Sequence, residues 1–295
     1  MASAAGGAED PRTLPSLLRL TPAPKETMTG PAAVYYAAEA DWWRINNSYK
    51  RAFGGQLAGH CVVAAASVAP AGFEWHSLHL YFLRAGQMTR TRYEVHELRV
   101  GRSFALYEVT GFEENEAKPI VRAAVSFHNS ASEKGPPLYV SPPPKMPPPE
   151  TSPTRVPNIG LNAPSPTDDH PNVRQADSEG RAWWIRLSQR SDEALTGPAL
   201  WGAIAFMSDL QFLWVAVRPF RGVAELTMIT SLDHTVHFHG GVAAVNGWLL
   251  YACDSPFAAS GRAVVRGKIW TADGAHMATT MQEGVLRVKL RGGKL

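Results

Sequence analysis

A single aspartate interrupts the longest nearly uncharged apolar stretch of the chain. Residues 199–217 form a run of nineteen residues whose only charge is that of Asp209. A buried carboxylate without a partner costs several kcal/mol, so its presence in such a run requires either an ion pair or a chemical role. The residues alone leave two interpretations open: a neutralised structural carboxylate, or a general base that accepts a proton during catalysis.

Histidine and cysteine are the other side chains with reactive or metal-binding chemistry. His237 and His239 alternate onto one face of a predicted strand, and Asp233 lies further back on that face. A zinc site needs three or four such ligands with supporting hydrogen bonds, and the sequence offers no further one. We therefore expect ordinary strand histidines, no metal and no cofactor. The two cysteines, Cys61 and Cys253, lie far apart in apolar runs and are expected as buried thiols.

Motifs and composition disfavour several other classes of protein. The 295 residues contain neither a Gly-x-Ser-x-Gly nucleophile elbow nor a Gly-x-x-x-x-Gly-Lys phosphate loop. The formal net charge is +3, and the basic residues are scattered, so no electrostatic footprint for nucleic acid is present. Hydrophobic residues at 45% and charged residues at 19% are typical of a globular protein.

The run that carries Asp209 predicts a long helix without a polar face. Its nineteen residues could cross a bilayer, but Ser208, Asp209 and Gln211 lie at its middle, where lipid disfavours polar groups. We therefore expect no membrane span. A helix that is apolar all round must be enclosed by protein, and a strongly curved antiparallel sheet would enclose it.

Proline marks a boundary between two parts of the chain. Thirteen of the 23 prolines lie between residues 136 and 171. Proline lacks an amide donor and fixes φ, so this stretch predicts a semi-rigid surface linker. The predicted organisation is a loose leader (residues 1–27), an N-terminal domain (28–130), the linker (131–175) and a C-terminal domain (176–295).

The two predicted domains resemble each other. In each, one apolar helix (residues 54–68 and 199–217) lies near the start of a series of strand-like runs, which is an α+β pattern. Aligning Ala105 with Ala263 also aligns Phe112 with Trp270 without a gap. The strand-like runs are residues 76–83, 91–98, 103–112 and 119–128 in the first half, and 181–187, 227–238, 248–255, 261–271 and 277–290 in the second.

Several motifs are similar to those of type II acyl-CoA thioesterases, which occur in bacteria and in peroxisomes. They are Phe53-Gly54-Gly55-Gln56 and residues 76–84 (HSLHLYFLR), 208–213 (SDLQFL), 231–234 (SLDH), 248–251 (WLLY) and 282–287 (QEGVLR). The resemblance covers residues 52–128 and 182–287. It implies a double hotdog fold, in which two fused halves each wrap a curved antiparallel sheet around a long helix. It also implies hydrolysis of acyl-CoA to a free carboxylic acid and CoA.

The same resemblance implies a catalytic site made of Asp209, Ser231 and Gln282 around an attacking water. Asp209 would act as general base, Gln282 would orient the water, and Ser231 would hold the carboxylate or the water. The backbone amides of Gly54 and Gly55, at the start of a Gly-rich helix, are candidate donors to the oxyanion that forms. The implied partner is the acyl-CoA substrate.

Two alternatives to this hydrolase stay open. One is a non-catalytic relative that binds acyl-CoA, and the other is a thioesterase dedicated to a specialised metabolic pathway. A hydratase is disfavoured, because hotdog hydratases carry a His five residues after the Asp. This chain has Trp214 at that spacing from Asp209.

The chain departs from the family pattern at two places. After Phe238-His239 it has Gly240-Gly241 instead of Arg-Pro, which removes a positive charge near the expected mouth of the site or changes a turn. Residues 171–180 stand where the family has a strand that opens the second half, and they have poor strand character. We therefore expect a shortened second sheet, or a differently covered edge.

Location and association are further expectations. The tripeptide Gly293-Lys294-Leu295 differs only at its first position from a Ser-Lys-Leu peroxisomal signal, so the expected location is the peroxisome and otherwise the cytoplasm. Because unpaired sheet edges invite pairing, association into homo-oligomers is also expected.

Overall fold

The computed structural model of the chain describes residues 14–24, 30–43, 51–132, 138–151, 173–175, 181–186, 194–220, 224–240, 244–245 and 247–290. The C-terminal tripeptide 293–295, Gly241 and most of the interval 171–180 lie outside these residues.

The N-terminal half wraps an antiparallel sheet around one helix. The strand order is β1-β2-β4-β5-β6-β3, and helix α2 packs against β2 to β6. Most residues of this helix are buried, including Gln56 and His60, because the curved sheet encloses the helix. The elements are β1 (Thr21–Pro22), β2 (Ala33–Ala37), α2 (Gly54–Ala66), β3 (Glu74–Phe82), β4 (Thr91–Val100), β5 (Phe104–Glu113) and β6 (Val121–His128).

The C-terminal half repeats this plan. Its strand order is β11-β15-β14-β13-β8-β7, and β10 pairs with the far end of β15. The strands are β7 (Val173–Gln175), β8 (Ala182–Arg186), β10 (Ala224–Ser231), β11 (Asp233–Phe238), β13 (Trp248–Ala259), β14 (Arg262–Thr271) and β15 (His276–Leu290). The helical elements are α3 (Gly197–Ser208) and the 3-10 helix η5 (Leu213–Phe220), and β9 (Leu195–Thr196) pairs with β12 (Ala244–Val245).

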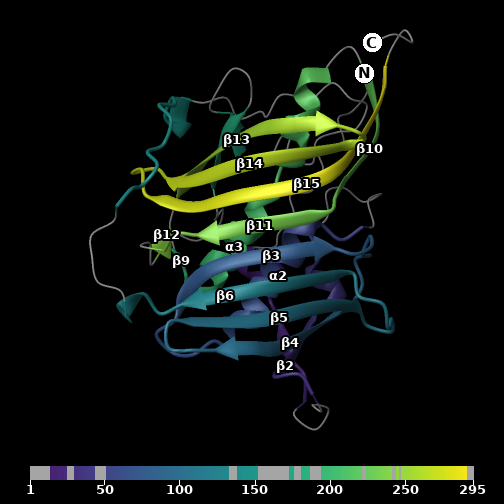
Figure 1. Ribbon diagram of the computed structural model, residues 1–295, viewed down its shortest axis with the longest axis vertical. Coiled ribbons are helices and arrows are strands. Elements are labelled where there is room, and N and C mark those ends of the chain that lie inside the picture. Colours follow the sequence, from purple (N-terminus) through teal and green to yellow (C-terminus); the bar gives the residue numbers. More distant parts are fainter. Residues whose placement is uncertain are drawn as a thin grey trace, which may run out of the picture.

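One pair of strands joins the two halves. β3 and β11 run antiparallel, with Tyr81 opposite Asp233 and Ser77 opposite His237. The two sheets therefore form one continuous sheet along the long axis of the molecule, with α2 and α3 behind it (Figure 1). The predicted α+β double hotdog is confirmed.

The two helices pack antiparallel and very close together. A Cβ placed on Gly55 would lie 2.2 Å from the carbonyl oxygen of Phe206, and one on Gly59 would lie 2.8 Å from the carbonyl oxygen of Gly202. Only glycine permits this approach of one backbone to the other. As a result, the start of α2 lies beside the end of α3, where Asp209 follows.

The predicted helix over residues 199–217 is wrong in one respect. α3 ends at Ser208, Asp209 is its C-cap, and Gln211 has a φ of 60°. The chain then continues as η5. Residues Gly197–Phe220 are long and apolar enough to cross a membrane, yet 89% of the apolar window is buried inside the protein, as expected for a core segment.

The N-terminal leader is not loose over residues 14–24. A short helix, α1 (Leu14–Leu17), ends in the buried residue Leu17. The next residue, Leu18, is buried where the two helices cross. His60 and Gln56 of α2 both bond the carbonyl oxygen of Leu17, at 2.8 and 2.7 Å. The Gln of the Gly-Gly-Gln motif is therefore used to hold the leader.

Two other predictions need adjustment. The predicted strand 227–238 is divided at Leu232 into β10 and β11. The first of these strands pairs with β15 alone, whereas the second pairs with both β15 and β3. Within the interval 171–180, the short strand β7 is present and pairs with β8. Gly240 has a φ of +67°, so its departure from the family pattern provides a turn that favours glycine.

Part of the proline-rich linker is fixed to the sheet. Trp270 donates its indole N–H to the carbonyl oxygen of Ser141 and Trp184 to that of Pro147, both at 2.9 Å. Residues 141–147 thus cover the face of the C-terminal sheet that points away from α3. A groove of about 900 Å³ lies there, and its lining includes Lys268 and Met281.

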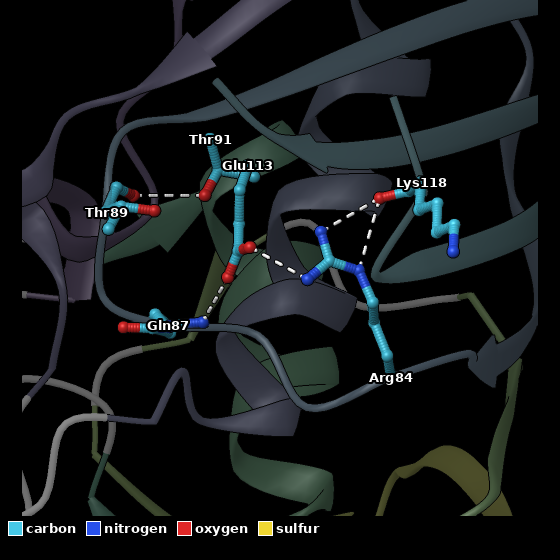
Figure 2. Close-up of polar contacts among 6 residues, drawn as sticks. All are labelled: Arg84, Gln87, Thr89, Thr91, Glu113 and Lys118. Carbon is cyan, nitrogen blue, oxygen red and sulfur yellow. Dashed lines mark hydrogen bonds and ion pairs between the residues drawn. The ribbon is translucent and has the colours of Figure 1, made fainter. Parts of the chain in front are cut away.

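A polar cluster anchors the loop that precedes β4 and supports the start of α2. Glu113 accepts hydrogen bonds from the Arg84 guanidinium at 2.9 Å and from the amide of Gln87 at 2.7 Å, and Arg84 also donates to the carbonyl oxygen of Lys118 (Figure 2). Because Ala52 donates its amide to the carbonyl oxygen of Gly86 in this loop, the cluster holds the chain just before α2.

Candidate active site

Three side chains from the C-terminal half meet at the end of α3. The Gln282 amide Nε2 donates to Asp209 Oδ1 at 2.7 Å and to Ser231 Oγ at 3.1 Å. Asp209 caps the helix, Ser231 ends β10, and Gln282 lies inside β15. The structure thus brings together all three residues that the resemblance placed at the site.

The N-terminal half contributes the start of α2 to the same site. The amide of Gly55 donates a hydrogen bond to the Asp209 carboxylate. A Cβ on Gly54 would lie 2.8 Å from Asp209 Oδ2 and 2.9 Å from the ring of Phe82, so a larger residue would obstruct this contact. The positive end of the helix macrodipole faces the carboxylate and favours its charged form.

Burial and hydrogen bonding act on Asp209 in opposite directions. Loss of hydration raises the pKa of its carboxyl to about 6, although the hydrogen bonds from Gln282 and Gly55 lower it. A carboxyl with this pKa is mostly ionised at neutral pH and is basic enough to accept a proton from water in a transition state.

Gln282 is a fixed donor rather than a mobile one. It is fully buried, and both hydrogens of its amide are engaged, one with Asp209 and one with Ser231. The reversed amide would place its oxygen against the carboxylate, so the observed orientation is the one that ionised Asp209 stabilises. Since Ser231 accepts this bond, its own hydroxyl hydrogen is left to donate elsewhere.

The residue before Asp209 is held from two sides. Ser208 Oγ donates to the carbonyl oxygen of Ala205 at 2.9 Å, so the 2.7 Å contact with His234 Nε2 requires that the imidazole donates. Burial lowers the pKa of His234 to about 3, which keeps the ring neutral. On the other side, the Tyr251 hydroxyl donates to the carbonyl oxygen of Ser208 at 2.6 Å.

Three aromatic rings pack beside the start of α2. Trp43, Phe53 and Phe206 contact one another edge to face, with ring centroids 4.9 to 5.7 Å apart. Trp43 lies between β2 and α2, Phe53 is the N-cap of α2, and Phe206 lies in the last turn of α3. This apolar wall lies next to the glycines that contact Asp209.

The histidines considered as metal ligands lie apart from this site. His237 packs against the ring of His79, and His239 Nε2 bonds Thr279 Oγ1 at 2.8 Å. Asp233 accepts the amide hydrogen of Glu283 at 2.7 Å. Within the part of the chain that the structure describes, no group of three or more His, Cys, Asp or Glu residues is placed to hold a metal ion.

Comparison with known proteins assigns both halves. Residues 40–128 match the family described as the N-terminal domain of acyl-CoA thioesterases, and residues 140–286 match the C-terminal domain. Acyl-coenzyme A thioesterase 8 of Homo sapiens is 32% identical over 266 residues, which cover 81% of this chain and 82% of that protein. The chain belongs to the acyl-CoA thioesterase family.

Bacterial members of the acyl-CoA thioesterase family are similar over nearly the whole chain. Acyl-CoA thioesterase 2 of Haemophilus influenzae is 28% identical over 264 residues, covering 81% of this chain and 88% of that protein. The crystal structure of an acyl-CoA thioesterase II from Mycobacterium marinum is 27% identical with a TM-score of 0.68, covering 96% of this chain and 99% of that one. A hot dog fold protein from Alicyclobacillus acidocaldarius, 19% identical with a TM-score of 0.70 and coverage of 94% and 98%, shares the fold.

The structure bears on one of the two predicted oxyanion donors of this family member. Gly54 and Gly55 were candidate oxyanion donors, and the amide of Gly55 is engaged with the Asp209 carboxylate. The sequence does not show which acceptor a backbone amide contacts, so this bond could not be predicted. The contacts of Ser208, His234 and Tyr251 were also missed, although all three residues lie within or beside the matching motifs.

Proposed function

We propose that this chain hydrolyses acyl-CoA thioesters to a free carboxylic acid and CoA, with Asp209 as the general base. The observation that carries the proposal is the convergence of Asp209, Ser231 and Gln282 at the end of α3, opposite the start of α2. Family membership supports the substrate class, and the site geometry supports the roles of the residues.

In the proposed first step, the oxygen of a water attacks the thioester carbonyl carbon while Asp209 takes a proton from that water. The Ser231 hydroxyl, which accepts from Gln282, donates its own hydrogen to the water and orients it. Gln282 has no titratable proton, so its role is to fix the carboxylate and the serine in one geometry.

The tetrahedral intermediate carries its negative charge on the former carbonyl oxygen. Since Gly55 is engaged with Asp209, we assign the oxyanion contact to the amide of Gly54, the first residue of α2, where amides have no helical acceptor. The intermediate then collapses with cleavage of the carbon–sulfur bond. The proton held by Asp209 passes to the CoA sulfur, which restores the carboxylate.

Thiol release from a panel of acyl-CoA esters tests this proposal. Asp209→Asn keeps the shape but removes the proton acceptor, so we expect kcat to fall by roughly 10²–10⁴ with little change in KM. Asp254→Asn is the matched control, because Asp254 is an exposed partner of Arg266, remote from the site, and should turn over at the parent rate.

Folded Asp209→Asn protein that hydrolyses at the parent rate would exclude Asp209 as the base. Parent protein that binds acyl-CoA but releases no CoA from any ester of the panel would instead support the non-catalytic relative. The same panel, run across acyl chain lengths, defines the substrate range.

Location and association stay predictions as well. We propose a peroxisomal location, which imaging of an N-terminally tagged chain together with a peroxisomal marker would test. We also propose a homo-oligomer, and light scattering after size exclusion would contradict it if the chain stays monomeric at every concentration.

A further inference from the structure

Helix α3 ends in the middle of an apolar run that continues for several residues. In an uninterrupted helix, the carbonyl oxygen of Ser208 would accept the amide of Phe212, four residues later. Instead, the Tyr251 hydroxyl donates to this carbonyl at 2.6 Å, and the amide of Phe212 turns to the carbonyl oxygen of Asp209 at 3.4 Å. A side chain from a strand thus occupies the acceptor that the next helical turn needs.

We propose that Tyr251 is a positioning residue for catalysis: its hydroxyl ends α3 at Ser208 and thereby fixes the Asp209 carboxylate toward Gln282 and the start of α2. The inference rests on the proposed role of Asp209 as the base. In this role Tyr251 acts through the backbone of Ser208, the residue before Asp209, and takes no part in the proton transfer.

The hydroxyl is itself held by the strand that carries Gln282. Since the single hydrogen of the Tyr251 hydroxyl goes to Ser208, its 3.0 Å contact with Thr280 Oγ1 must use the threonine hydrogen. Thr280 lies two residues before Gln282 on β15. Strand β15 therefore contacts both groups: its Thr280 bonds the Tyr251 hydroxyl, and its Gln282 bonds the Asp209 carboxylate.

The ring of Tyr251 is buried between two other aromatic rings. It is 0% exposed and packs against Trp183 and Phe212, with ring centroids 5.3 and 5.5 Å away. His234 holds the Ser208 side chain from the opposite side. The end of α3 is thus fixed by contacts from three strands, β11, β13 and β15.

Tyr251→Phe removes the hydroxyl and keeps the ring. Without the cap, the Ser208 carbonyl becomes available for a further helical turn and Asp209 shifts, so we expect kcat to fall roughly 10- to 100-fold with KM within about twofold of the parent. Loss of the hydrogen bonds that lower the pKa of Asp209 should also move the acid limb of the kcat/KM profile to higher pH.

Tyr107→Phe is a matched control in the other half of the molecule. The Tyr107 hydroxyl donates to the carbonyl oxygen of Val68, just beyond the end of α2, at 3.0 Å. The substitution removes the same group from the same kind of bond, next to the other central helix. We expect a comparable loss of thermal stability, with kcat and the acid limb unchanged.

The inference is overturned if Tyr251→Phe keeps the parent kcat and acid limb while losing as much stability as Tyr107→Phe. If Tyr251→Phe does not fold, Thr280→Val decides, since it removes the partner hydroxyl with little change of shape. In Thr280→Val, a kcat below that of the parent together with an acid limb shifted to higher pH supports the inference. Parent values of both kcat and the acid limb overturn it. Parent activity in Asp209→Asn would mark a failure of the proposed base instead.

Discussion

At the scale of single residues, the Asp209 carboxylate is held in a balance between solvation and hydrogen bonding. Burial alone would keep it protonated, and the donors Gln282 and Gly55 partly restore the charged form. The resulting pKa of about 6 lies close to neutral pH. A base is most effective when its pKa is near the working pH. Burial destabilises the ionised carboxylate of Asp209 and thereby makes it more basic.

The pH profile follows directly from this pKa. The base must be ionised to accept a proton, so kcat/KM should rise about tenfold per pH unit below a pH of about 6 and level off above it. Thiol release followed from pH 4.5 to 8 measures the profile. A rate that stays constant down to pH 4.5 would show that no group with a raised carboxyl pKa limits the reaction.

The same pKa predicts a cost in stability. The folded carboxyl holds its proton up to about pH 6, whereas the ordinary pKa of an aspartate is 3.8. The charge therefore opposes folding above this window and not below it. Asp209→Asn should therefore raise the free energy of unfolding at pH 7.5 by on the order of 1–3 kcal/mol, and by little at pH 4. Urea denaturation at both pH values measures the difference. A variant less stable than the parent at pH 7.5 would contradict this expectation.

At the scale of elements, alternation and apolar runs predicted most of the fold, and long-range contacts set the rest. The predicted run 91–98 became β4 (Thr91–Val100) because alternating apolar residues define a half-buried strand. The end of α3 could not be predicted, since it depends on Tyr251, 43 residues further along the chain. The grouping of Asp209, Ser231 and Gln282 was predicted by resemblance. The contact of Gly55 with Asp209 could not be predicted, because it depends on how α2 meets α3.

The close approach of α2 and α3 makes a prediction at this scale. In Gly55→Ala the new Cβ would lie 2.2 Å from a backbone oxygen of α3, so the helices must separate. We expect the free energy of unfolding to fall by about 1–3 kcal/mol. We also expect a lower kcat, because the amide of residue 55 moves away from Asp209. Gly101→Ala is the control, since its Cβ would meet its nearest neighbour at an ordinary 3.4 Å. Equal stability of both variants would argue against the helix contact as described.

At the scale of the whole molecule, the halves share a sheet and a core. β3 pairs with β11 across the seam, α2 packs on α3, and buried residues of both halves form one hydrophobic cluster. Each central helix is therefore covered in part by the other half. The domain boundaries 28–130 and 176–295 stay predictions from the sequence, whereas the coupling of the halves follows from these contacts.

Unfolding of the intact chain should accordingly be cooperative. We expect calorimetry to record a single thermal transition, because separation of the halves would expose the apolar faces of both helices. Gly55→Ala should lower the temperature of that transition without dividing it. Two resolved transitions in the parent chain would contradict the shared core.

Because α2 and α3 are antiparallel, the start of each helix lies beside the end of the other. Only the place where α2 starts and α3 ends carries the carboxylate and amide groups of the proposed site. The repeat register that aligns Ala105 with Ala263 also aligns Tyr107 with Val265. The sheet partner of Tyr107 is Val125, and that of Val265 is Gln282, so Val125 and Gln282 occupy equivalent places. At the other place, the counterparts are Ser67 for Asp209 at the helix end, Pro198 for Gly55 at the helix start, and Val125 for Gln282 on the strand.

This asymmetry fixes the stoichiometry of the molecule. Serine cannot serve as a carboxylate base, proline has no amide hydrogen to donate, and valine cannot orient a water. We therefore expect one active site per chain, although the chain has two similar halves. Titration with a tight-binding analogue of acyl-CoA should saturate at one equivalent per chain.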